Sequence, residues 1–408
     1  MSTSCDTALE QYVRLQPESL ADPYTLFHWL RAEDPVYWSE RVDGWVLTGY
    51  PVVVAILRDP RVSSNRHTDA RTRLREAARE QARALREHLS LMMGNSDPPN
   101  HTRLRSLINK AFTPRVVEAM SSRIQALADQ LLDAVQGAGR MDVIRDFAYR
   151  LPIIVISELL GIPAEDRTQF KQWSDDFIGF IAAGRPSVER AQRAQQSLLA
   201  MADYFRDIAA VRRRRTQNYL ISGLMSTEER GQRLNEGELL AMCNSLLAGG
   251  HETTTNLFRN GLLALLRYPD QLRELRQTPA MIVGAVEELL RCDSPVQRLE
   301  RFATQDLDLG RHRIRAGQRL WPMLGAANRD PAQFPDPDRL DIRRQPNPHL
   351  AFAHGIHFCV GAPLARVEGQ IGFATLLRRF QKLELAYGAV QWRAILAHRG
   401  LESLPVAV

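Results

Sequence analysis

The longest helical pattern in the sequence runs from Leu234 to Leu266, where apolar residues recur at three- and four-residue spacing. Asn235 and Glu238, three residues apart, form the signature of a capping box at its start. Pro269 ends the pattern, because a proline cannot continue a helix interior. The sequence therefore predicts one long helix, and a fold that contains it is built largely from helices.

Further helical patterns cover Val117–Val135 and Met281–Cys292, whereas the β signals are short and local. The predicted strands lie within Pro35–Trp38, Trp45–Thr48, Ala303–Leu309 and Arg313–Ile314. We expect one mainly α domain with minor β structure over residues 1–408, its strand-rich parts at about residues 35–60 and 296–325. Between Asn328 and Pro348 runs a long irregular stretch, which in a compact domain is usually functional.

Composition excludes several classes of protein. The 408 residues are 44% hydrophobic and 25% charged, as in ordinary globular proteins. The net charge of +6 permits nucleic acid, an acidic protein or an anionic membrane as partner. However, no apolar run approaches the roughly 18 residues that span a bilayer. Neither a secretory signal nor a nucleic-acid-binding motif is visible. We expect a soluble, cytoplasmic monomer that binds neither nucleic acid nor membrane.

The cysteines are too far apart for a disulfide framework or a zinc pair; they are Cys5, Cys243, Cys292 and Cys359. Glycines flank Cys359, and a helix-like run begins directly after it, with Pro363 in its first turn. Backbone N–H groups and the positive end of that helix would stabilise a thiolate there. Taken alone, a lone cysteine is more often a buried structural residue.

The middle of the long helix is weak. Gly249 and Gly250 each lower helix propensity by up to about 1 kcal/mol, and three threonines follow shortly after them. Such a break in a local rule indicates strain, a bulge or a functional site. The alternative is a weak segment that tertiary packing tolerates.

Two segments together resemble the cytochrome P-450 family, most closely its soluble bacterial members. Residues 352–366 resemble the family's haem-binding loop, and residues 246–255 resemble its oxygen-binding helix. The resemblance covers nearly the whole chain and implies the cytochrome P-450 fold with haem b as cofactor. It makes Cys359 the axial ligand, with Phe352 on the sulfur side and Gly361 beside the haem. The chain departs from the family at Ala353, where glycine is usual, and at Gly249, where alanine is more common.

In the oxygen-binding helix the resemblance makes Glu252 and Thr253 an acid–alcohol pair that delivers protons while bulk water is excluded. It implies a monooxygenase that inserts one oxygen of O₂ into a mid-sized, mainly apolar small molecule, by hydroxylation or epoxidation, in secondary metabolism. Electrons would come from NAD(P)H through separate redox partners. The alternatives are a peroxide-driven or rearranging haem-thiolate enzyme, or a haem sensor without turnover.

Other site residues are also implied by the resemblance. Basic side chains suit the carboxylates of the haem propionates; those at the family's positions are His101, Arg105, Arg301 and His357. A structural triad would hold the cysteine loop in place; its members are Glu288, Arg291 and Arg339.

Partner and substrate surfaces are less sharply marked. Basic residues that the family places behind the cysteine would attract an acidic ferredoxin or flavodoxin-like donor with its reductase; they are Arg103, Lys110, Arg115, Arg366, Arg378 and Arg379. A generally basic surface is the alternative. Substrate-pocket candidates are Met92, Met93, Leu247, Val296, Leu299 and Leu401, and Arg71–Arg86 is interpreted as a charged helix covering the site.

Overall fold

The computed structural model describes residues 2–65, 83–181, 187–214, 219–228, 230–386 and 390–408. They form two compact units. The first comprises Met1–Val62, Ala119–Pro152 and Glu252–Val408, and the second comprises Ser63–Glu118 and Ile153–His251. Most of the predicted covering helix Arg71–Arg86 lies outside the described residues, which resume at Arg83.

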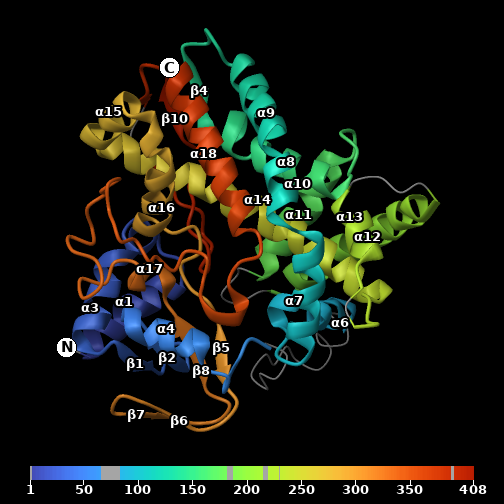
Figure 1. Cartoon of the computed structure of the whole chain (residues 1–408). Helices are drawn as coiled ribbons and strands as arrows, with labels where there is room; N and C mark the ends of the chain where they lie inside the picture. The colour runs from blue at the N-terminus through green and yellow to red at the C-terminus, as the bar shows by residue number, and fades with distance from the viewer. Residues whose placement is uncertain (1, 66–82, 182–186, 215–218, 229, 387–389) are drawn as a thin grey trace. The chain divides into compact units, whose positions relative to one another are not determined.

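Among the described residues, the first unit contains helices and nearly all of the strands (Figure 1). Its helices are α1 (Ser2–Val13), α2 (Pro17–Ala21), α3 (Pro23–Glu33), α4 (Tyr50–Arg58), α9 (Ser121–Asp133), α15 (Pro269–Gln277), α16 (Ile282–Cys292), α17 (Leu324–Ala327) and α18 (Ala362–Arg379). Shorter turns are η3 (Ile144–Ala148), η4 (Pro279–Met281) and η5 (Gly355–His357). Its strands are β1 (Val36–Ser39), β2 (Gly44–Leu47), β4 (Arg140–Asp142), β5 (Arg301–Ala303), β6 (Leu307–Leu309), β7 (His312–Ile314), β8 (Arg319–Pro322), β9 (Glu384–Leu385) and β10 (Pro405–Ala407), and β3 (Val62–Ser63) begins at its boundary.

Three sheets organise these strands. The largest has the order β1-β2-β8-β5-β3, and the others are β4-β10-β9 and the pair β6-β7. Strands β1 and β2 pair antiparallel, whereas β2 pairs parallel with β8, so that Gly44 lies opposite Arg319. The two predicted strand-rich regions therefore meet in one sheet. A buried cluster that includes Leu47, Ile56 and Leu320 packs this sheet against α4, and each such side chain contributes about 1.5–3 kcal/mol by its burial.

Three helices of the first unit pack closely through glycines. A β-carbon at Gly372 of α18 would lie 2.5 Å from ring atoms of Phe258, and one at Gly261 would lie 2.7 Å from the ring of Phe373. Gly369 similarly faces side chains of both the long helix α14 (Glu236–Arg267) and α16. Because real β-carbons do not approach this closely, glycine lets the backbones of α14 and α18 lie side by side. The loop before α18 and the middle of α14 therefore belong to helices that lie side by side.

The second unit is helical. It contains α6 (Arg83–Leu91), η2 (Met93–Asn95), α7 (Asn100–Ala111), α11 (Arg167–Ile181), α12 (Val188–Arg214) and α13 (Leu220–Ser226), together with most of α8 (Pro114–Ala119) and α10 (Arg150–Leu160) and the first half of α14. An aromatic cluster packs α11 against α12, with the rings of Phe170 and Tyr204 4.7 Å apart. The capping box at the start of α14 is confirmed: the Glu238 N–H donates to Asn235 Oδ1 at 2.9 Å, and the Asn235 N–H donates to Glu238 Oε2 at 3.0 Å.

The predicted mainly α fold with minor β structure is confirmed. Among the described residues, no helix is both long and apolar enough to cross a membrane.

Candidate functional site

The cysteine loop leads directly into α18. The Cys359 N–H donates to the Phe352 carbonyl at 3.0 Å, which closes the loop, and α18 begins at Ala362 with a proline in its first turn. The helix has 18 residues, so its N-terminal N–H groups present a positive end toward the cysteine. The expected turn followed by a helix is therefore present.

Two loop positions show why small residues stand there. Gly355 has φ +72°, and a β-carbon on it would lie 2.3 Å from the Leu57 carbonyl oxygen of α4. Glycine is required at this position by conformation and by space. Ala353 has φ +60°, a left-handed conformation that costs an L-residue about 1–2 kcal/mol. The alanine that departs from the family's usual glycine therefore sits in a conformation that glycine adopts without strain.

The exposure of the loop fits a haem. Among the four cysteines only the Cys359 side chain is exposed, and burial raises the pKa of Cys243 to about 12. Ile356 and Phe358, which precede Cys359 in the loop, are 53% and 39% exposed, although both are large and apolar. A thiol and apolar side chains on one short loop suit a flat apolar ligand with a metal at its centre. The donor set thus fits the group that the sequence resemblance implies.

Glu287 of α16, which the sequence analysis missed, joins the loop to α18. Arg366 donates to it from Nε and Nη2, both at 2.8 Å, and His349 Nε2 lies 3.1 Å from its Oε2. Burial acts to raise the pKa of Glu287, but hydrogen bonds and charges from these two basic groups hold it at about 2. The guanidinium of Arg366 also lies 4.6 Å from the ring centroid of Phe352, which it holds behind the cysteine.

The predicted triad requires one correction. Glu288 and Arg291 form a fully buried bidentate pair at 2.7 and 2.8 Å. Arg339 is exposed and contributes only its backbone carbonyl, which accepts from Arg291 Nη2 at 3.1 Å. The further guanidinium at Glu288 is that of Arg344, whose Nε lies 3.2 Å from Oε2. The prediction of the Arg339 side chain is therefore wrong, because the chain turns that side chain outward and brings Arg344, five residues later, to the carboxylate.

The predicted weak middle of α14 forms a continuous helix, so no bulge is present there. Glu252 is 1% exposed, and three donors surround its Oε1. Asn256 Nδ2 donates to it at 3.3 Å, Arg259 Nη1 lies at 3.6 Å, and Arg393 Nη1 makes a short contact. Asn256 and Arg259 follow Glu252 at helical spacing, so periodicity could have found them. Arg393 stands 141 residues away and has no such local signal.

Thr253 differs from the threonines that follow it. Thr254 and Thr255 are buried, whereas Thr253 is only half-buried. Gly249 lies four residues earlier on the same helix face and is exposed; among the described residues, no atom lies within 4 Å of a β-carbon built on it. This face of α14 therefore has room for a ligand.

The predicted propionate anchors are divided between the two units. His101 and Arg105 lie one turn apart on α7 of the second unit, and burial and the Arg105 charge lower the pKa of His101. Arg301 on β5 and His357 on η5 belong to the first unit. Arg301 is nearly buried and donates to the Glu300 carbonyl at 2.8 Å. Their joint role toward one haem stays a prediction.

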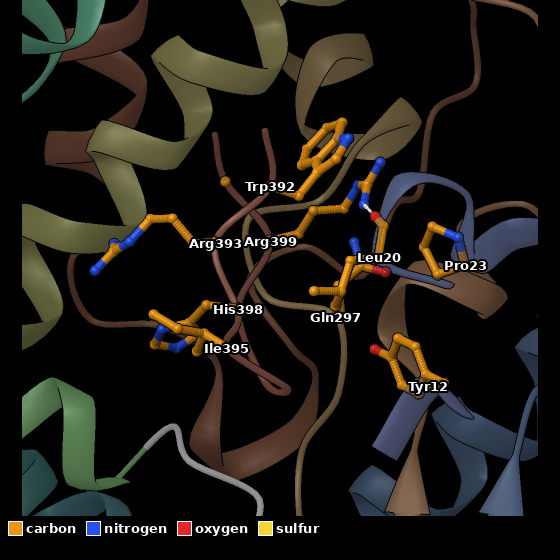
Figure 2. Close-up of a pocket in the computed structure, with 10 residues that line it drawn as sticks. Tyr12, Leu20, Pro23, Gln297, Trp392, Arg393, Ile395, His398 and Arg399 are labelled. Atoms are coloured by element: carbon orange, nitrogen blue, oxygen red, sulfur yellow. Dashed lines mark hydrogen bonds between the residues drawn. The ribbon is translucent and has the colours of Figure 1, made fainter. Parts of the chain in front are cut away.

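The substrate-pocket candidates are also divided. Met92, Met93 and Leu247 lie in the second unit, and Val296, Leu299 and Leu401 lie in the first. Val296 and Leu299 are half-buried against the core, whereas Leu401 is fully buried and pairs with Trp392. The first unit also contains a small pocket of about 10 Å³, enough for a single water molecule, and Figure 2 shows the residues that line it. It is lined by Tyr12, Leu20, Pro23, Gln297, Trp392, Arg393, Ile395, His398, Arg399 and Gly400.

Several of the predicted basic donor-binding residues have acidic partners. Arg103 pairs with Glu238 and Arg366 with Glu287. Arg378 and Arg379 both pair with Asp129, and Arg379 also reaches Asp133. Their charge is therefore partly neutralised, which the sequence did not reveal because the acids are distant along the chain.

Comparisons with known proteins agree with these observations. A sequence model of the cytochrome P450 family matches residues 44–386. The biotin biosynthesis cytochrome P450 of Bacillus subtilis (strain 168) is 41% identical over 391 residues, covering 95% of this chain and 97% of that protein. Cytochrome P450 monooxygenase PikC of Streptomyces venezuelae is 42% identical over 95% of this chain and 91% of its own. The crystal structure of P450BioI with hexadec-9Z-enoic acid ligated acyl carrier protein is 39% identical, with a TM-score of 0.89 over 96% of this chain and 99% of that one.

Replacing Arg344 by Met should lower the free energy of unfolding by about 1.5–3 kcal/mol, because a buried carboxylate loses a charged donor. Replacing Arg339 by Met should change it by less than about 0.5 kcal/mol, because that side chain is exposed and its carbonyl remains. Urea unfolding followed by circular dichroism measures both. Equal losses in the two variants would contradict the assignment of Arg344.

Proposed function

We propose, because this chain belongs to the cytochrome P450 family, that Cys359 is the axial ligand of its haem and that Glu252 and Thr253 deliver protons during turnover. The chain is a haem-thiolate monooxygenase, which uses O₂ and receives electrons from redox partners. When bound, the haem supplies the oxidising chemistry. The protein residues hold the haem, orient the substrate and move protons.

The exposure of the Cys359 thiol is the observation that carries the ligand assignment. The other three cysteines are buried, and burial raises the pKa values of Cys243 and Cys292. Only Cys359 stands before the N-terminus of a long helix, where backbone dipoles favour the thiolate. Phe352, held by Arg366, would shield the sulfur from water on its inner side. Gly361 has no side chain beside the sulfur; a β-carbon on it would lie 3.8 Å from Cys359 Sγ.

Proton delivery is assigned to Glu252 and Thr253. Glu252 is a buried carboxylate surrounded by hydrogen-bond donors, and Thr253 is the half-buried hydroxyl on the open face of α14. A carboxyl group beside a hydroxyl can pass a proton into a site from which bulk water is excluded. We assign the haem propionates to His101, Arg105, Arg301 and His357, because guanidinium and imidazole groups bind carboxylates well.

The substrate is inferred to be a mid-sized, mainly apolar molecule that undergoes hydroxylation or epoxidation in secondary metabolism. Half-buried Val296 and Leu299 support an apolar wall. The solved relative P450BioI was crystallised with a hexadecenoic acyl chain on a carrier protein. A long apolar chain, either free or attached to a carrier, is therefore the class to test.

The electron donor is inferred to be an acidic ferredoxin or flavodoxin-like protein with an NAD(P)H-dependent reductase, which would place the enzyme in the cytoplasm. The net charge of +6 supports attraction to an acidic protein. Lys110 and Arg115 contribute to it: Lys110 Nζ donates to the Glu228 carbonyl at 3.1 Å, and Arg115 is exposed.

The ligand assignment predicts that the reduced protein with carbon monoxide shows the red-shifted Soret band of a thiolate-ligated haem. Replacing Cys359 by His should abolish that band, because the sulfur donor is lost. Replacing buried Cys243 by Ala should leave the band in place and serves as the control. If the Cys359→His variant kept the band, the assignment would be wrong.

Hexadec-9-enoic acid should bind the holoenzyme and shift its Soret band, because each buried methylene contributes about 0.8 kcal/mol. Butyric acid at the same concentration serves as the control and should give no shift. A shift only when the long acid is attached to acyl carrier protein would support a carrier-bound apolar substrate. The absence of a shift in both forms would contradict the inferred class.

Reduction by a plant-type ferredoxin should slow at least about tenfold between about 0.01 and 1 M salt, because the Debye length falls from about 30 to 3 Å. Stopped-flow absorbance of the haem measures the rate, and a small neutral reductant provides the control. A ferredoxin rate that is independent of salt would contradict an acidic donor docked by charge.

A further inference from the structure

We propose that Arg393 is a positioning residue for proton delivery: from the C-terminal hairpin, residues 391–402, it holds the carboxylate of Glu252 in place. This inference rests on the proposed role of Glu252 and adds a residue that neither motif of the sequence contains. The hairpin is defined by the pairing of Trp392 with Leu401 and by two backbone bonds of 2.9 Å, from the Arg393 N–H to the Gly400 carbonyl and from the Glu402 N–H to the Gln391 carbonyl.

Three side-chain donors approach the same oxygen of Glu252. Arg393 Nη1, Arg259 Nη1 and Asn256 Nδ2 each approach Oε1, and Arg393 makes the shortest contact. Arg259 is 3.6 Å away and also donates to Asn256 Oδ1 at 2.9 Å, so its charge is shared. Among these three donors, Arg393 is therefore the principal partner of the carboxylate. An anchored Oε1 restricts rotation of the carboxyl group and so determines where its second oxygen lies.

Burial makes this partner necessary. Glu252 is 1% exposed, and a carboxylate so deeply buried is unstable without a charged partner. The Arg393 side chain is 28% exposed, so its guanidinium can withdraw toward solvent while the acid cannot. A difference in exposure of this kind suits a partner that is released and regained, because the arginine remains solvated in both positions.

The hairpin does not depend on Arg393 for its attachment. A β-carbon at Gly400 would lie 2.0 Å from Asn256 Oδ1, so the hairpin backbone lies directly against α14. Arg399 donates to Asp293 Oδ1 at 2.7 Å and to the Leu20 carbonyl. Figure 2 shows that the side chains of Arg393 and Arg399 leave the hairpin in different directions. Removing the Arg393 side chain therefore leaves these attachments in place.

The proposed proton transfers begin from the ion pair between Glu252 and Arg393. Glu252 takes a proton from a hydronium ion, which becomes water, and the neutral acid loses its attraction to Arg393. The acid then gives its proton to the Thr253 hydroxyl, which passes its own proton on toward the oxygen substrate. Glu252 returns to the carboxylate and pairs with Arg393 again. The arginine thus returns the acid to the same position before each transfer.

The test compares the holoenzyme with its Arg393→Met, Arg393→Lys, Glu252→Gln and double Glu252→Gln/Arg393→Met variants. Each receives electrons from a plant-type ferredoxin and its reductase, with hexadec-9-enoic acid as the probe. The measured quantity is the fraction of consumed O₂ that leaves as hydrogen peroxide, which is defined whether or not the acid is oxidised. Arg399→Met is the matched control, because it removes an ion pair from the same hairpin without touching Glu252.

We expect Arg393→Met to lower turnover about tenfold through misplacement of the acid and to raise the peroxide fraction several-fold. Arg393→Lys should restore most of both. The double variant should be no worse than Glu252→Gln alone, since Arg393 acts through Glu252. Arg399→Met should leave the peroxide fraction unchanged.

Three results would overturn the inference: an unchanged peroxide fraction in Arg393→Met, an additive double variant, or an Arg399→Met variant as uncoupled as Arg393→Met. The proposed role of Glu252 fails separately, if Glu252→Gln itself does not change the peroxide fraction.

A second measurement does not depend on turnover. Urea unfolding of the unchanged protein, Glu252→Gln, Arg393→Met and the double variant forms a double-mutant cycle between positions 252 and 393. Glu252→Gln and Arg393→Met should be coupled by about tenfold in the unfolding equilibrium constant, as expected for a buried charge pair. Independent, multiplicative effects would show that the two side chains do not interact in the folded enzyme and would overturn the inference.

Discussion

The chain that leads to the cysteine loop depends on the buried ion pair between Glu288 and Arg291. Arg291 is fully buried and also donates to the carbonyls of Asn328 and Pro337 at 2.8 Å. Asn328 Oδ1 in turn accepts from the Leu350 N–H at 2.6 Å, just before the cysteine loop begins. One ion pair thus holds a stretch of chain without helix or strand in a single conformation. Such a pair specifies geometry more than it adds stability, since both ions lose their hydration.

The acid proposed to deliver protons, Glu252, uses the same physics for a different purpose. Glu252, like Glu288, is a buried carboxylate with arginine partners, but Arg393 is partly exposed and Arg344 almost fully buried. A fully enclosed pair is fixed, whereas a pair with one exposed member can open. Glycines let α14 and α18 pack closely, so Glu252 and the cysteine loop belong to neighbouring helices. Rigid support for the cysteine loop, together with a buried acid whose arginine partner is partly exposed, suits the binding of haem and the proposed transfer of protons.

Local signals predicted local features well. The capping box at Asn235, the helix that starts after Cys359, and the short strands of the two strand-rich regions are all present, because each depends on residues close together in the sequence. The error at Arg339 has a physical cause. In an irregular segment no periodicity tells which of several arginines turns inward, and the choice of Arg344 was made by the path of the backbone around Glu288.

By itself, the sequence determined that the fold is mainly helical, which follows from the spacing of its apolar residues. Its resemblance to the cytochrome P-450 family led to the roles proposed for Cys359, Glu252 and Thr253. Tertiary structure alone decided which charges neutralise one another. Arg393 reaches Glu252 and Arg366 reaches Glu287 across long stretches of chain. Burial strengthens such pairs by removing water, and burial exists only once distant segments have packed together.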